Sequence, residues 1–284
     1  MSNSSIRTIR EDAKQLFNEA RPWIKTVARL GYAAKGVVYV LIGTMAMLVA
    51  EGRKEQPADF SGVLIQVVRQ PFGSLLLALL TIGLACYGLW CLVQAVLDTE
   101  KKGTSFFAIT TRLLYTGVGF VYLAVAWSAC RLLTGTGSVR PGDRPEQQWT
   151  ATFLALRPYG QWLVVLVGIG FIGSSFHEFH RAYIGGSQVL KTEGTTRKAE
   201  DFLAMRIAQI GITARAVVFS IIGFFLIRSA VDYDPNKVHG ISGTLAALRQ
   251  PPYGPWALVT IAMGLIAYGG YMLFLSFRRR IDPV

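Results

Sequence analysis

The stretch that decides the fold is VARLGYAAKGVVYVLIGTMAMLVA, residues 27–50, an apolar run interrupted by only two basic side chains. A helix needs about 20 such residues to cross the hydrocarbon core of a bilayer, because each residue adds about 1.5 Å. The start of this stretch returns twice in altered form: the copies are RLGYAAKGVVY at 29–39, RLLYTGVGFVY at 112–122 and QIGITARAVVF at 209–219. One hydrophobic module repeated three times predicts an integral membrane repeat protein.

The composition agrees with a membrane protein. Of the 284 residues, 52% are hydrophobic and 16% are charged, whereas soluble domains carry about 25% charged residues. The net charge of +12 comes from Lys and Arg in short loops and at helix ends, which favours anionic lipid over nucleic acid as the partner. The cysteines lie inside apolar runs without CxxC spacing, so we expect small buried residues rather than disulfides or a zinc site.

Six apolar segments are long enough to span a bilayer: 27–50, 72–97, 107–133, 159–183, 207–230 and 253–277. The second segment of each pair begins with proline, an aromatic residue and glycine, and another glycine follows ten residues later, at Gly83, Gly170 and Gly264. Four residues further on, the outer copies have Tyr87-Gly88 and Tyr268-Gly269, whereas the middle copy has Ser174-Ser175. The sequence therefore predicts an all-α integral membrane protein, a six-helix bundle of three parallel two-helix repeats with pseudo-threefold symmetry.

The repeats divide the chain. The expected parts are a cytoplasmic amphipathic segment 1–26, repeat 1 at 27–97, repeat 2 at 106–184, repeat 3 at 207–277 and a basic tail 278–284. In the first part, apolar residues three to four apart predict a short helix that ends at Pro22, with a disordered basic tail as the alternative. Within each repeat, a stretch too short to span is expected to form one or two interfacial helical turns; these stretches are 61–69, 150–157 and 242–249.

The distribution of basic residues predicts the orientation. Seventeen of the 29 Lys and Arg residues lie on the side that holds both termini, and ten lie on the opposite side. The excess predicts that both the N- and the C-terminus lie in the cytoplasm. Small residues also recur in register, at Gly36, Gly119 and Ala216, and seven residues later at Gly43, Ala126 and Gly223. Two turns apart, they predict a helix face that approaches a neighbour closely.

These repeated elements, Arg/Gln-x-Gly/Leu-x5-Val/Phe-Val-Tyr/Phe followed by Pro-Phe/Tyr-Gly-x9-Gly, resemble a family of bacterial integral membrane proteins catalogued as a domain of unknown function. The family has three tandem two-helix modules, and the resemblance covers residues 27–277. The middle repeat departs from the pattern at Leu114, Val118 and Ser174-Ser175. The resemblance implies a six-helix bacterial membrane protein, so the plasma (inner) membrane is the expected location, and it transfers no catalytic residues.

Ionisable residues inside the spans are the candidate site, because each costs about 2.5–3.5 kcal/mol at the centre of a membrane helix. Lys35 and Arg215 hold equivalent positions in repeats 1 and 3, where repeat 2 has Val118. Helix 159–183 carries the remaining candidates: Ser174, Ser175, His177, Glu178 and His180. The simplest interpretation is that both cations snorkel to cytoplasmic phosphates and that residues 177–181 form an interfacial helix end. The alternatives are an ion-paired cluster with Glu178, or a site for a proton, an anion or a substrate.

No catalytic, cofactor-binding or metal-binding constellation is recognisable, and the remaining histidine, His239, lies in a loop on the predicted far side. We therefore expect a non-enzymatic structural or interaction module, whose membrane-protein partner is unknown. The alternative is a small transporter or channel for an anion or small polar solute along the pseudo-threefold axis, lined by Lys35, Arg215, Ser174 and Ser175. An enzyme that acts on lipid is a third hypothesis, and it lacks a recognisable nucleophile and base.

Overall fold

The long apolar segments form the spanning helices of a computed structural model. The model describes residues 3–53, 60–97, 106–136, 145–156, 159–183, 198–249 and 252–278. The six long helices are α1 (Asn3–Ala50), α3 (Gly73–Leu97), α4 (Phe106–Leu133), α6 (Tyr159–Tyr183), α8 (Lys198–Asp232) and α10 (Gly254–Arg278). Each contains a segment of 22 to 28 residues that is long and apolar enough to cross a membrane. The predicted spans are thus confirmed, and the chain is a multi-pass membrane protein.

Shorter helices occupy the connections inside the repeats, where the sequence predicts interfacial turns. They are α2 (Phe60–Val68), α5 (Pro145–Ala155) and α9 (Ile241–Arg249). Before α9, the 3-10 helix η1 (Pro235–Lys237) begins at Asp234, whose carboxylate accepts a hydrogen bond from the backbone N–H of Asn236. From α5, the amide of Gln147 donates to the carbonyl oxygens of Asn236 and Val238, 3.2 and 3.3 Å away. Repeats 2 and 3 are therefore joined through their connections as well as through their spanning helices.

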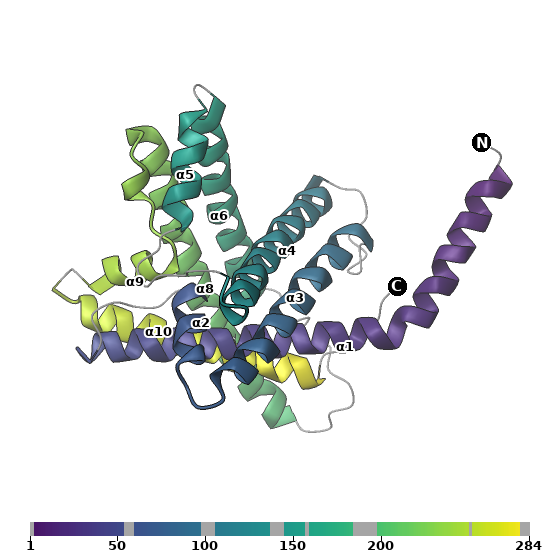
Figure 1. The fold of residues 1–284 in the computed structure, drawn as a ribbon, viewed down its shortest axis with the longest axis horizontal. Coiled ribbons are helices and arrows are strands. Elements are labelled where there is room, and N and C mark those ends of the chain that lie inside the picture. The colour runs from purple at the N-terminus through teal and green to yellow at the C-terminus, as the bar shows by residue number, and fades with distance from the viewer. Residues whose placement is uncertain are drawn as a thin grey trace.

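The first helix differs from the prediction at its N-terminal end. Helix α1 continues from Asn3 to Ala50 through Pro22, so the prediction that Pro22 ends a separate short helix is wrong. Proline inside a helix removes one backbone hydrogen bond and commonly bends the helix without ending it. Figure 1 shows the N-terminal part of α1 turning away from the rest. The side chains of residues 3–25 and the tail residues 279–284 lie outside the described part of the chain.

The spanning helices pack as three pairs, each joining one repeat to the next: α1 with α10, α3 with α4, and α6 with α8. Contacts within repeat 1 (α1 with α3) and within repeat 3 (α8 with α10) connect these pairs. The helices thus follow one another in space as α4, α3, α1, α10, α8 and α6. Helices α4 and α6, the two spans of repeat 2, form no comparable interface in the described chain. The pairs spread from a common centre like a fan (Figure 1).

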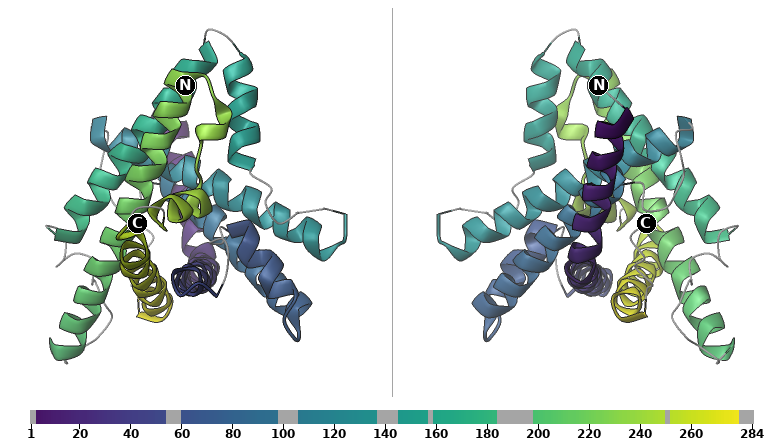
Figure 2. Two further views of the ribbon diagram at one scale, coloured as in Figure 1. Left: turned by 90° about the vertical axis from the view of Figure 1, so that its left-hand side faces the viewer. Right: turned by 90° about the vertical axis from the view of Figure 1, so that its right-hand side faces the viewer.

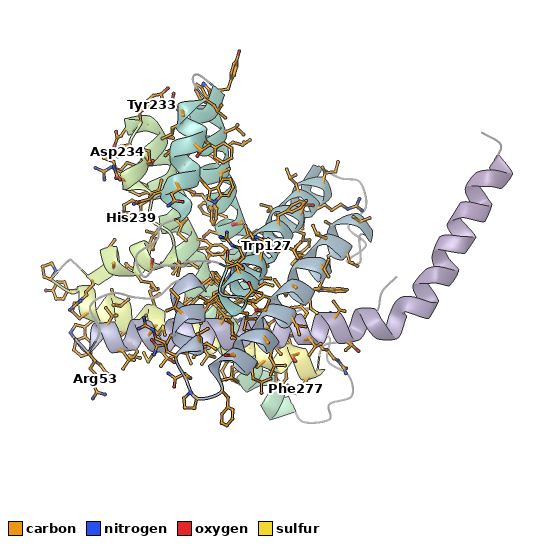
Figure 3. The ribbon with its side chains drawn as sticks, viewed as in Figure 1. Arg53, Trp127, Tyr233, Asp234, His239 and Phe277 are labelled. Carbon is orange, nitrogen blue, oxygen red and sulfur yellow. The ribbon has the colours of Figure 1, made fainter. Side chains whose placement is uncertain are left out.

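The α1–α10 pair is antiparallel and makes the most extensive interface between any two helices. Figure 2 views these two helices nearly end-on, side by side. In Figure 3, Arg53 after the end of α1 and Phe277 at the end of α10 lie at opposite ends of the pair. This pair joins the first repeat to the last, so the first and last spanning helices are held together at one interface.

Small residues form the contacts between repeats, as the sequence predicts. A Cβ atom added at Gly36 would lie 2.8 Å from the carbonyl oxygen of Gly269, and one at Gly119 would lie 3.0 Å from that of Gly88. At the third equivalent interface, the Ser175 hydroxyl donates to the carbonyl oxygen of Ala216 at 2.7 Å. Such distances leave no room for a side chain, so the backbones touch.

The contacts within a repeat are equally close where they are formed. A Cβ atom at Gly83 would lie 2.4 Å from the Cβ atom of Ala34, and one at Gly264 would lie 2.2 Å from that of Ala214. The first contact lies within repeat 1 and the second within repeat 3, at equivalent positions. The corresponding contact of repeat 2 is not formed, and the pseudo-threefold axis therefore stays a prediction.

We predict that Gly264→Val destabilises the protein by about 1–3 kcal/mol, the usual cost of overpacking a filled interface. The added side chain would meet Ala214, and α8 and α10 would have to separate. Gly270→Val is the matched control, because Gly270 lies on the same helix and a Cβ atom there meets nothing within 4 Å. Thermal unfolding in detergent should show a lower midpoint for Gly264→Val alone. Equal midpoints for the two variants would contradict this packing.

Candidate functional site

The spanning helices cross at a buried polar centre. Lys35 on α1 is 2% exposed and Arg215 on α8 is 8% exposed. Long basic side chains near a membrane surface normally extend their charged groups toward water or phosphate. Both head groups instead end inside the protein, against side chains of other helices. The snorkelling interpretation is therefore wrong for both cations.

Lys35 is held by tyrosines from three helices. Its Nζ atom donates a hydrogen bond of 2.6 Å to the hydroxyl of Tyr87 on α3. The same atom lies 5.4 Å from the ring centre of Tyr122 on α4 and 5.6 Å from that of Tyr268 on α10. A cation within about 6 Å of an aromatic face is attracted to it, by about 2 kcal/mol when water is excluded. These contacts take the place of the hydration that Lys35 lacks.

Arg215 has a carboxylate partner from the middle repeat. Its Nη1 atom donates to Oε1 of Glu178 on α6 at 2.8 Å and to the hydroxyl of Tyr268 at 2.7 Å. The guanidinium carbon also lies 4.5 Å from the ring centre of Phe219. Glu178 thus pairs with Arg215, while the ammonium of Lys35 binds Tyr87. The geometry forms one of the two pairings that the sequence allows for Glu178.

The two cations repeat one arrangement. Lys35 and Tyr87 hold the same positions in repeat 1 that Arg215 and Tyr268 hold in repeat 3, and each cation donates to its own tyrosine hydroxyl. Repeat 2 has Val118 and Ser174 at these positions. The cation and its tyrosine are therefore present together or absent together.

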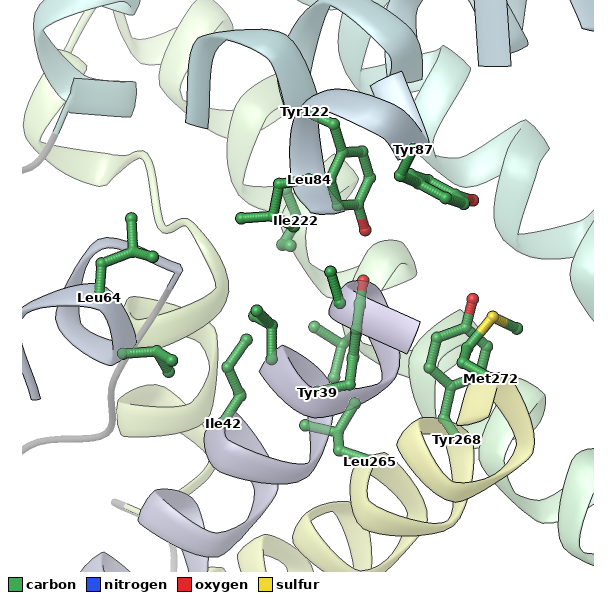
Figure 4. Close-up of a cluster of buried hydrophobic side chains, with 14 of the residues drawn as sticks. Tyr39, Ile42, Leu64, Leu84, Tyr87, Tyr122, Ile222, Leu265, Tyr268 and Met272 are labelled. Carbon is green, nitrogen blue, oxygen red and sulfur yellow. The ribbon is translucent and has the colours of Figure 1, made fainter. Parts of the chain in front are cut away.

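Each of the six spanning helices contributes a side chain to this centre: Lys35 from α1, Tyr87 from α3, Tyr122 from α4, Glu178 from α6, Arg215 from α8 and Tyr268 from α10. We call these residues, together with Tyr39 of α1, the central cluster. Ring centres lie 4.8 Å apart for Tyr39 and Tyr268, and 4.6 Å apart for Tyr87 and Tyr122, in edge-to-face geometry. Figure 4 shows these tyrosines approaching the same region from four helices.

The tyrosines of the central cluster are not among the site residues predicted from the sequence. A signal was present, because Tyr87 and Tyr268 occupy the same register of their repeats, and so do Tyr39 and Tyr122. Phe60 of α2 closes the cluster from the connection, with its ring centre 5.7 Å from that of Tyr39 and 5.6 Å from that of Tyr122. Among the described residues, the aromatic rings of the central cluster and Phe60 pack against one another.

The other predicted site residues lie beside the cluster. Ser175 bonds to Ser220 at 2.6 Å as well as to the Ala216 carbonyl oxygen, and so it fastens α6 to α8. Ser174 donates to the carbonyl oxygen of Phe171 in its own helix. His177 is half-buried and His180 is exposed. Among these predicted residues, the structure joins Glu178 to Arg215 and gives Ser175 a role at the helix interface.

The electrostatics of the cluster are unbalanced. Among the described residues of the central cluster, Lys35 and Arg215 are cations and Glu178 is the one carboxylate, and electron-rich ring faces lie beside both cations. The Arg215–Glu178 pair rests on a single N–O contact, because Nε of Arg215 and Oε2 of Glu178 are buried without a hydrogen-bond partner among the described residues. Within the same residues, no group of three His, Cys, Asp or Glu side chains is placed to hold a metal ion.

A groove of ≈ 470 Å³ lies apart from the two cations, between α8 and α9. Its lining is mainly apolar and consists of Ser220, Ile221, Phe224, Phe225, Thr244, Ala247 and Leu248. Neither Lys35 nor Arg215 is among these residues. The groove therefore offers the central charges no direct opening.

Comparison with known proteins agrees with the three repeats. The family described as Domain of Unknown Function (DUF1206) matches the chain at residues 30–98, 113–185 and 210–279. A relative, "Uncharacterized protein YxxB" of Bacillus subtilis (strain 168), is 38% identical over 257 residues, which are 90% of this chain and 91% of that protein. No solved structure matches the chain. The protein thus belongs to the Domain of Unknown Function (DUF1206) family, whose domain it carries three times over.

Proposed function

We propose that this protein is a non-enzymatic structural or interaction module of the bacterial plasma membrane, with both termini in the cytoplasm. The observation that carries the proposal is the central cluster, in which the intramembrane charges bind one another and tyrosine side chains. A side chain that serves transport or catalysis must present a polar atom to its solute or substrate. The head groups of Lys35 and Arg215 are used to join helices.

The distribution of the cluster over all six spanning helices supports the same role. Buried charge in a membrane is costly, and breaking a buried pair is costlier than forming it is favourable. A bundle that contains such charges is therefore restricted to arrangements in which every helix brings its partner group into place. That restriction gives a defined shape to a surface that a membrane partner could recognise. The excess of Lys and Arg on the side of the termini supports the proposed orientation. The relative in Bacillus subtilis supports a bacterial membrane.

We predict a strong coupling between Arg215 and Glu178 in a double-mutant cycle. Arg215→Gln and Glu178→Gln should each lower the unfolding free energy by about 3–5 kcal/mol, because each leaves a buried charge unpaired. The double variant should lose less than the sum of the two, by about 1–3 kcal/mol. Unfolding in mixed micelles, followed by circular dichroism, measures all four proteins.

Arg228→Gln serves as the control for this cycle. Arg228 also lies on α8, but it pairs with Asp232 at 3.7 Å on an exposed surface. Exposed pairs contribute little, so the unfolding midpoint should not move. Additive losses for Arg215 and Glu178 would contradict a structural role for their contact.

The transport alternative is tested by anion flux. Purified protein in liposomes should give no chloride or phosphate flux above that of protein-free liposomes, because the central cations are occupied by protein side chains. A flux that Lys35→Met or Arg215→Gln abolishes, while Arg228→Gln leaves it intact, would replace the proposed function with anion transport. The comparison uses variants that are first shown to be folded by circular dichroism.

A further inference from the structure

Repeats 1 and 3 pack their own two helices in the same way. Gly83 lies against Ala34 in repeat 1, and Gly264 lies against Ala214 in repeat 3. One turn before each alanine, a second glycine meets the tyrosine of the second helix. A Cβ atom at Gly31 would lie 2.7 Å from the Tyr87 backbone, and the equivalent Gly211 meets the Tyr268 backbone at 2.4 Å.

Repeat 2 keeps the residues for this contact but does not form it. Gly170 corresponds to Gly83 and Gly264, and Gly117 corresponds to Ala34 and Ala214. A Cβ atom at Gly117 or at Gly170 would meet nothing within 4 Å. Repeat 2 thus has both small residues of this contact, Gly117 on α4 and Gly170 on α6, and in the described part of the chain no other residue fills either position. We call this pair of positions the notch.

The second contact position shows an exchange of size. Where the outer repeats pack a glycine against a tyrosine, repeat 2 has the larger Leu114 at the glycine position and the smaller Ser174 at the tyrosine position. If α4 and α6 met in the same way, a small residue would again pack against a large one, which is what a packed interface requires and a lipid-facing surface does not.

The orientations of the helix pairs also support a contact between α4 and α6. In Figures 1 and 2, the α1–α10 pair and the α6–α8 pair run in clearly different directions. Helices that cross one bilayer are usually tilted by about 20° and seldom by more than about 40°. Spanning one membrane therefore favours an arrangement in which the three helix pairs are more nearly aligned than in this fan. The spans of α4 and α6, only 22% and 17% buried against 44–56% for the other four, are the ones with free surface to bring together.

We propose that α4 and α6 pack against each other in the bilayer and close the ring of six helices, with Gly117 against Gly170 and Leu114 beside Ser174. The described structure is the open form, and repeat 2 is the seam at which the bundle opens and closes. Closure gives repeat 2 the internal contact that the other repeats have. It also encloses the central cluster, to which α4 contributes Tyr122 and α6 contributes Glu178. This inference is independent of the proposed function.

The test is a cysteine pair, Gly117→Cys with Gly170→Cys, in a chain whose Cys86, Cys91 and Cys130 are replaced by alanine. Neither new side chain meets an atom within 4 Å of its Cβ in the open form, so both are accommodated. The membranes are oxidised with copper phenanthroline, and the protein is then denatured in SDS and labelled with maleimide. We expect an intramolecular disulfide, seen as loss of labelling in monomeric protein. The control pair is Leu113→Cys with Ile169→Cys, on side chains that are 72% and 54% exposed and should remain labelled.

The other outcomes overturn the proposal. Disulfide-linked dimers would show that a second copy of the chain occupies the seam. Full labelling of both cysteines would show that the seam stays open in the membrane.

Spin labels at Leu113→Cys and Ile169→Cys in nanodiscs provide a second measurement that does not depend on disulfide formation. The protein that retains Gly170 should show a short distance between α4 and α6, which Gly170→Phe should abolish by filling the notch. An unchanged, single long distance in both proteins would also overturn the proposal.

Discussion

The structure depends on one constraint: each of two cations inside a membrane helix bundle needs partner groups from the protein. Lipid offers no hydration to Lys35 or Arg215, so the bundle must supply hydroxyls, rings and a carboxylate at the right depth. Every spanning helix contributes one of these groups, and the axial position of each helix is thereby fixed relative to the others. Backbone contact at small residues, such as Gly36 with Gly269, then determines how closely the helices approach. The polar centre determines the depth of each helix in the membrane, and the glycines determine the distance between neighbouring helices.

The middle repeat has a different task from its neighbours. Repeats 1 and 3 each provide a cation with its tyrosine, whereas repeat 2 provides Glu178, the carboxylate that pairs with Arg215. Glu178 lies one helical turn beyond Ser174, the residue that replaces the tyrosine. Repeat 2 has Val118 in place of a third cation on α4 and carries the acid Glu178 on α6, and both differences reduce the net charge that the bundle must bury. The departure of repeat 2 from the common pattern is thus part of the electrostatic arrangement of the whole.

Much of the fold follows from the sequence, because spans and close contacts depend on local composition. Six apolar segments, the short connecting helices and the small residues between repeats were all predictable. Pro22 was misleading, since a proline can bend a long helix as readily as end a short one. The rise of about 1.5 Å per residue determines how far along its helix each of Lys35, Arg215 and Glu178 lies, but it does not determine how each helix is rotated about its axis. The choice of Arg215 as the partner of Glu178, and the tyrosines around Lys35, depend on that rotation and on packing between distant segments.

The three interfaces between repeats join the second helix of one module to the first helix of the next, in the head-to-tail manner of a cyclic oligomer. Separate identical modules assembled in this way would bring three identical charges to their centre. Three lysines would repel one another, and three glutamates would do the same. Covalent fusion removes that restriction, since each copy can mutate alone. A tandem chain can therefore form a centre with two bases and one acid, which a homotrimer of identical modules cannot form. This difference favours keeping the three domains in one polypeptide.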